Sequence, residues 1–216
     1  MFAAYGAYDQ INIAKRQNEI ADRQSLGALV ADITQQKRVL EKTTPAERLP
    51  FEQAVQADAE EALALVDTLS KPVPPIDNYE IGTAFEGAAA YYNALASYRR
   101  AAETSIDPHY RASSLRGEAK IFYALGGAAN LAKARAAVEG AYHSYDGQPD
   151  VSRTTLESNF IFTDLFAARN EAPSDCEHAR TLLDDGRSLA RAYPNAVSTT
   201  AKGMQGYAEE VVARCP

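Results

Sequence analysis

The fold is decided by residues 81–108, which read IGTAFEGAAAYYNALASYRRAAETSIDP. Apolar and small residues recur there at the spacing of one face of an α-helix. Gly87 interrupts the pattern, and Pro108 ends it because proline cannot continue a helix. The stretch therefore predicts two helices, at 78–86 and 88–104, packed against each other as a hairpin.

Glycine and proline divide the rest of the chain in the same way. They predict a second helix pair, a third pair and a last single helix. The expected limits are 109–125 with 128–145, 151–169 with 175–193, and 196–214. Residues 174–177 have the Ser/Thr-x-x-Glu arrangement of a capping box, which we expect to open the second helix of the third pair.

A long helix is expected before the hairpin, over residues 9–42. Gly27 is the only glycine in that range and no proline occurs in it. Its apolar residues share one helical face, which favours packing on the body of the protein. They are Leu26, Leu29, Ile33 and Leu40.

A second helix is expected from Pro50 to Ser70. The stretch 71–75, Lys-Pro-Val-Pro-Pro, must end it because three prolines stand there. We take this proline-rich stretch as the boundary between two domains. These are an N-terminal helical region, 1–70, and a helical repeat domain, 76–216.

The hairpin at 81–108 resembles a tetratricopeptide repeat. Residues 81–85 look like the family's Leu-Gly-x-x-Tyr, while Ala94 and Tyr98 fit its Ala-x-x-x-Phe. Ala101 is the next small residue, and Pro108 is the closing proline. The resemblance implies an all-α fold of stacked antiparallel hairpins, with the long helix before the array and a capping helix after it.

The second helices of the later pairs repeat this small-large-small pattern. Small residues let two helices approach closely, and the large residue fills the space between them. The interval from Ala94 to Ala134 is 40 residues and that from Ala134 to Ala179 is 45, and both exceed the family's usual period. The matching residues are Ala134, Val138 and Ala141, then Ala179, Leu183 and Gly186.

The composition disfavours a nucleic-acid surface. The 216 residues are 46% hydrophobic and 24% charged, so the chain can bury a core. The formal net charge is −7 at pH 7, and the basic residues are scattered. Binding to phosphate backbones needs clustered Lys and Arg, so DNA and RNA are not expected as partners.

The first eight residues, MFAAYGAY, are apolar and aromatic and run directly into a polar helix. No run in the chain reaches the roughly 20 apolar residues of a membrane span. The start nevertheless resembles the exit of a transmembrane helix upstream of Met1, with Tyr5 and Tyr8 at the interface level. The alternative is a frayed helix start that packs on the core.

The sequence offers no motif for catalysis or for metal binding. The three histidines, at 109, 143 and 178, lack a second ligand at helical spacing. Cys176 and His178 are two apart on a helix and face away from each other. Gly126 and Gly127 lack the Lys-Ser/Thr of a phosphate-binding loop, so a helix-to-helix turn is expected there. We expect no catalytic residue, no metal site, no cofactor and no enzymatic activity.

The resemblance implies an interaction module that binds a protein or a peptide. Members of the family use the surface formed by the first helix of each pair. In that register the partner-binding residues are Tyr79, Thr83 and Glu86, followed by Arg116, Lys120 and Tyr123 of the next pair. The alternative is a structural or regulatory domain of a membrane-associated assembly.

Cys176 and Cys215 are the only cysteines, and we expect them to form a disulfide. They are nearly equidistant from the turn at 193–195, so an antiparallel helix pair brings them to the same end. A disulfide favours an extracytoplasmic, membrane-tethered domain. Two buried thiols in a reducing cytoplasm are the alternative.

Overall fold

The chain folds into helices alone within the part that the structure, a computed structural model, describes. It describes the backbone of residues 2–215 and the side chains of residue 10 and residues 12–215. The helices are α1 (Phe2–Leu40), α2 (Leu49–Thr68), α3 (Pro75–Gly87), α4 (Tyr91–Thr104), α5 (Pro108–Leu125), α6 (Ala128–Tyr142), α7 (Arg153–Glu171), α8 (Cys176–Ala192) and α9 (Thr199–Ala213). Short 3₁₀ helices are η1 (Pro45–Glu47), η2 (His143–Tyr145) and η3 (Pro194–Ala196). The predicted all-α class is confirmed for these residues.

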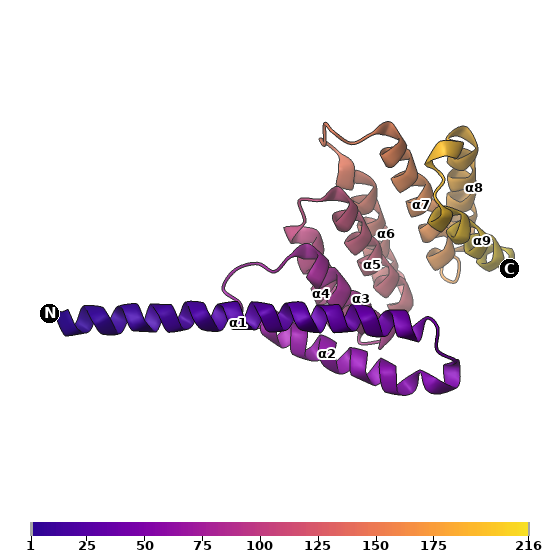
Figure 1. Cartoon of the computed structure of the whole chain (residues 1–216). Helices are drawn as coiled ribbons and strands as arrows, with labels where there is room; N and C mark the ends of the chain where they lie inside the picture. Colours follow the sequence, from indigo (N-terminus) through magenta and orange to yellow (C-terminus); the bar gives the residue numbers. More distant parts are fainter. Residues whose placement is uncertain (1, 216) are drawn as a thin grey trace. The chain divides into compact units, whose positions relative to one another are not determined.

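Two compact units divide the chain, one ending at Thr104 and the other starting at Ser105. Consecutive helices pack in pairs within them: α1 with α2, α3 with α4, α5 with α6, and α7 with α8. Figure 1 shows these helices in order along the chain. The proline-rich stretch at 71–75, where we expected a domain boundary, falls inside the first unit.

The first unit is built on α1. Its predicted apolar face is buried at Leu26 and Ile33, together with Val30, and α2 and α3 both pack against it. The loop after α2 is also fixed to α1, because the Ser70 hydroxyl donates a hydrogen bond to Glu19 at 2.6 Å. Arg23 donates to the carbonyl of Lys71 at 2.9 Å. These contacts hold the proline-rich stretch against α1.

The earlier part of α1 extends beyond the helices that pack on its second part (Figure 1). Ile13 and Ile20 are 54% and 57% exposed on it. The expected interfacial aromatics Tyr5 and Tyr8 lie outside the described side chains, and Met1 lies outside the described residues. No helix among residues 2–215 has both the length and the apolar character needed to cross a membrane.

The second unit is built around α7, which packs against α5, α6, α8 and α9. Its middle is buried continuously from Thr163 to Ala168, so one helix supplies core to four neighbours. The last helix, α9, packs on both α7 and α8. The core shared by α7, α8 and α9 includes Ile161, Leu165, Ala179, Leu183, Ala201, Ala208 and Val212.

Several helix ends in the second unit are set by capping side chains or by glycine. Asp107 caps α5 by accepting a hydrogen bond from the His109 amide at 2.7 Å. The turn between α5 and α6 uses Gly126 and Gly127 at φ 65° and 80°, where other residues are strained. The expected capping box at 174–177 is not formed, because Asp175 is the N-cap residue of α8 and accepts from the His178 amide at 3.1 Å.

Candidate functional site

The predicted residues Tyr79, Thr83 and Glu86 lie along one side of α3 and are half-buried. Tyr79 packs on Tyr98 of α4, with ring centroids 5.8 Å apart. The Tyr98 hydroxyl donates a hydrogen bond to the Glu86 carboxylate at 2.8 Å. Burial, and then the nearby Glu86 charge, raise the pKa of Tyr98, so its hydroxyl stays protonated. The α3–α4 hairpin therefore fixes two of the three side chains.

Thr83 faces α1. Lys37 of α1 donates hydrogen bonds to the Thr83 hydroxyl and, at 2.9 Å, to the Glu80 carboxylate. The ammonium group thus connects the long helix to the middle of α3. Of the three predicted residues on α3, Thr83 is the one that lines a recess of the first unit.

That recess is a groove of about 300 Å³ between the last part of α1, the first part of α2 and the second half of α3. Its size is at the lower end of the range for small-molecule sites. Apolar and charged side chains share the lining. The lining residues are Lys37, Leu40, Glu41, Arg48, Glu52, Val55, Thr83, Ala84, Gly87 and Ala88.

Two carboxylates in the groove have no side-chain partner among the residues that the structure describes. Lys37 is bound to Glu80, and Arg48 donates to the carbonyl of Thr43 at 3.2 Å. Neither Glu41 nor Glu52 makes a side-chain hydrogen bond or ion pair with any described residue, and both are exposed. The groove therefore combines an apolar lining with two carboxylates and the Arg48 guanidinium, none of which is in an ion pair with a described residue.

The second set of predicted residues lies in the other unit, on α5. Arg116 is only 8% exposed, and its guanidinium donates to Asn159 at 2.8 Å and to Thr163 at 3.0 Å. The same guanidinium lies 4.9 Å from the ring centroid of Phe162. These α7 partners give Arg116 a role inside the unit, so it is not a surface residue.

Tyr123 is buried as well, and Lys120 is half-buried. The Tyr123 hydroxyl donates to Glu171 of α7 at 3.0 Å, and burial raises its pKa. The expected binding surface on α5 thus retains Lys120 alone at partial exposure. Arg116 and Tyr123 are buried for the same reason, because each bonds to polar side chains of α7.

A buried carboxylate, Glu171, was not anticipated from the sequence. Its side chain is 1% exposed. It accepts from Tyr123, from both Nε and Nη2 of Arg135, and has His178 Nδ1 at 2.8 Å. Arg135 also reaches Asp175 at 2.6 Å. Donors from three helices converge on one carboxylate, so the cluster stabilises the second unit.

A second buried acid is Asp164, which is 7% exposed. The Tyr142 hydroxyl donates a hydrogen bond to it. Burial raises the pKa of Asp164 to about 6, although the bond from Tyr142 opposes that change. Burial likewise raises the pKa of the Tyr142 hydroxyl, which therefore remains the donor.

Cys176 and Cys215 lie at disulfide-bonding distance, with their Cα atoms 5.7 Å apart. Cys176 is the first residue of α8, and Cys215 follows the end of α9. The predicted proximity of the two cysteines is confirmed.

Among the residues that the structure describes, no group of three or more His, Cys, Asp or Glu side chains is placed to hold a metal ion. No family model, curated protein or solved structure matches the chain.

Proposed function

We propose that the protein is an interaction module that binds a segment of another protein in the α1–α2–α3 groove. The observation that carries the proposal is the pairing of an apolar lining with two unpartnered carboxylates, Glu41 and Glu52. A fitting segment has an apolar side chain with Lys or Arg close to it. The apolar group would be buried, and the cation would neutralise the carboxylates.

The predicted surface on α3 belongs to this proposal. Thr83 lines the groove, while Tyr79 and Glu86 continue the same side of the helix. Tyrosine has an apolar ring and a polar hydroxyl, which suits the edge of a protein interface. In this proposal the bound segment extends from the groove along α3.

We also propose that the helix pairs are divergent repeats of the tetratricopeptide kind. The small-large-small pattern is buried in the second helix of every pair from α3 onward, which supports the proposal. The buried triplets are Ala94, Tyr98 and Ala101 in α4, Ala134, Val138 and Ala141 in α6, and Ala179, Leu183 and Gly186 in α8.

The alternative function is that of a structural or regulatory domain in a membrane-associated assembly. One observation favours it: α1 carries exposed Ile13 and Ile20 on the part that extends beyond its packing partners. Such a helix could serve as a spacer or contact a sister domain. Under this alternative the cysteine pair fits a location outside the cytoplasm.

Peptide selection tests the main proposal. Random twelve-residue peptides would be selected for binding to the whole chain, and the affinities of the selected peptides would be measured by calorimetry. We expect the selected peptides to contain an apolar residue with Lys or Arg close to it. The double substitution Glu41→Lys with Glu52→Lys should weaken their binding by about tenfold or more, because it replaces attraction by repulsion.

The matched control places the same charge change elsewhere on α2. Glu60 and Glu61 are exposed there and do not line the groove. The double substitution Glu60→Lys with Glu61→Lys should leave binding unchanged. Equal binding by the groove variant and the control variant would refute the proposed groove, provided that circular dichroism shows both to be folded.

A further inference from the structure

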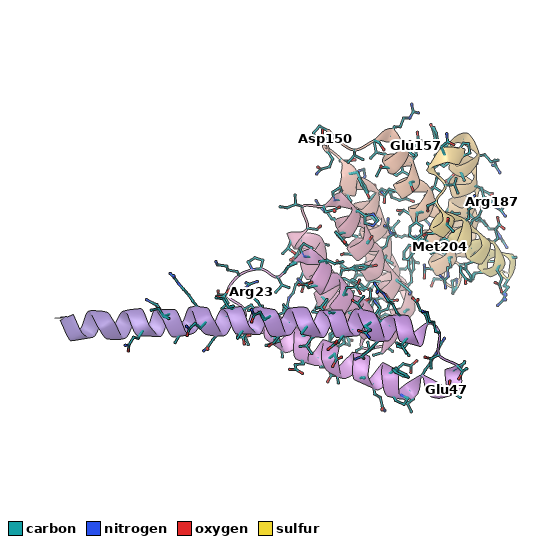
Figure 2. The ribbon with its side chains drawn as sticks, viewed as in Figure 1. Arg23, Glu47, Asp150, Glu157, Arg187 and Met204 are labelled. Atoms are coloured by element: carbon teal, nitrogen blue, oxygen red, sulfur yellow. A yellow bond between two sulfur atoms is a disulfide. The ribbon has the colours of Figure 1, made fainter. Side chains whose placement is uncertain are left out.

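A second recess lies in the other unit, between the end of α8, η3 and α9. Its volume is about 360 Å³. Figure 2 labels Arg187 on α8 and Met204 on α9, the two helices that bound it. Pro194 and Val197 supply apolar lining, and the polar lining comes from Arg187, Arg191, Lys202 and Gln205. No acidic side chain is among the lining residues, although the whole chain has a formal net charge of −7.

One of the three cations in this recess is already neutralised. Arg187 lies 2.8 Å from Glu209 and 3.7 Å from Asp184. Gln205 donates to the same oxygen of Glu209 at 2.8 Å, and these two donors lower the pKa of Glu209. The Glu209 carboxylate is therefore ionised and balances the charge of Arg187.

The other two cations have no acidic partner among the described residues. Arg191 donates only to the Ser188 hydroxyl, at 3.0 Å, and Lys202 makes no side-chain hydrogen bond or ion pair. Both are exposed, so neither has to be desolvated before it meets a ligand. The recess thus presents two uncompensated positive charges, one on α8 and one on α9.

A phosphate group matches this arrangement. At neutral pH a phosphomonoester carries a charge of about −1.5 to −2, so it neutralises both cations, whereas a single carboxylate leaves one of them unpaired. A guanidinium donates two parallel hydrogen bonds to a phosphate, and an ammonium group adds a point charge. The apolar side formed by Pro194 and Val197 has room for the group to which the phosphate is attached.

We propose that the α8–η3–α9 recess is a phosphate-binding site, with Arg191 and Lys202 as its principal ligands and Gln205 as a polar neighbour. The bound phosphate is either inorganic phosphate or the phosphoryl group of a small monoester. This site is separate from the α1–α2–α3 groove, lies in the other unit and does not depend on the proposed peptide binding.

Titration followed by ¹⁵N–¹H spectra of the whole chain tests the proposal at constant ionic strength. Separate titrations would use inorganic phosphate, phosphoserine and acetate. We expect saturable shifts that centre on amides 187–205 for the first two, and weaker binding for acetate. Tighter binding of phosphoserine than of inorganic phosphate would assign the monoester as the ligand, and the reverse order would assign the free anion.

The test variant is Arg191→Ala with Lys202→Ala. It should weaken phosphate binding by about tenfold or more, since both charge-assisted contacts are lost. The control variant is Arg111→Ala with Lys133→Ala, which removes the same charge from exposed positions on α5 and α6. The control should bind as the unaltered protein does. Non-saturable shifts, acetate binding as tight as phosphate, or equal affinity in both variants would overturn the site.

Discussion

The ring of Tyr98 occupies the space in which a side chain at Gly82 would begin. A Cβ atom built at Gly82 would lie 2.8 Å from Cδ1 and 2.9 Å from Cε1 of Tyr98. The ring itself is 1% exposed, and its hydroxyl is bound to Glu86. Gly82 is therefore required by the close approach of α3 and α4. The sequence pattern predicts this approach, because it has a small residue at position 82.

Replacing Gly82 by Ala should destabilise the first unit. Overpacking in a core costs about 1–3 kcal/mol, and the gain from placing Ala instead of Gly in a helix is at most about 1 kcal/mol. We therefore expect the free energy of unfolding, measured in urea, to fall by up to about 2 kcal/mol. Gly27 is the matched control, because it lies within α1 with no atom near its Cβ position. Gly27→Ala should be neutral or stabilising; a stabilising Gly82→Ala would show that the ring can move.

Asp164 should make the stability of the second unit depend on pH. Its pKa is raised to about 6, so the native state binds a proton more tightly than the unfolded state does. Stability from this group is therefore present at low pH and is lost as the pH rises through 6. Lowering the pH from 7 to 5 should stabilise the unaltered protein by about 1 kcal/mol relative to Asp164→Asn.

The comparison with Asp164→Asn cancels the titration of other groups, such as His143, whose pKa is raised by Asp146 and Glu139. Asp150→Asn serves as the control, since Asp150 is exposed in the loop before α7 (Figure 2). It should show the same pH dependence as the unaltered protein. Identical pH profiles for Asp164→Asn and Asp150→Asn would contradict the assigned pKa.

Replacing the Glu171 carboxylate should destabilise the second unit by about 2–4 kcal/mol, because Tyr123, Arg135 and His178 all bond to this buried group. Glu171→Gln keeps the shape of the side chain and isolates the effect of charge. Glu177→Gln, at an exposed position of α8, should change stability by less than about 0.5 kcal/mol. Chemical unfolding of both variants provides the measurement, and a loss no larger for Glu171→Gln than for Glu177→Gln would mean that the cluster contributes little.

A disulfide between Cys176 and Cys215 should stabilise the chain by about 4 kcal/mol on a chain-entropy estimate for the sequence separation of 39. Reductant should lower the melting temperature of the unaltered protein. It should have no effect on the double variant Cys176→Ser with Cys215→Ser. Mass spectrometry after alkylation without reductant decides the oxidation state, and two modified thiols in protein from its native compartment would exclude the bond.

Helix limits could be predicted well where proline or glycine marks them. The expected helix at 109–125 is found as Pro108–Leu125, and the one at 175–193 as Cys176–Ala192. Prediction was less accurate between α3 and α4. The chain turns there at Ala88, Ala89 and Ala90, with Ala89 at φ 56°. Gly87 marks the end of α3, but alanine is the strongest helix former, so the extension of the turn to Ala90 has no local signal.

The candidate groove could be predicted in part. Thr83 was expected from its register with Gly82, but the contributions of α1 and α2 depend on long-range packing that one sequence does not reveal. Arg116 and Tyr123 illustrate the converse case. Both have the amphipathic character of surface residues, yet Asn159, Thr163 and Glu171 supply buried partners from a helix more than 40 positions away. Polar pairs of this kind have no periodic signature.

The position of the cysteine pair has a mechanical consequence. A pulling force applied at the C-terminus of the oxidised chain passes through Cys215 directly to Cys176, so α8, η3 and α9 carry no tension. The extensible contour is then shorter by roughly 130 Å than in the reduced chain, given the separation of 39 residues. Under load α5, α6 and α7 would extend, while the segment between the two cysteines remained a closed loop that the force cannot lengthen.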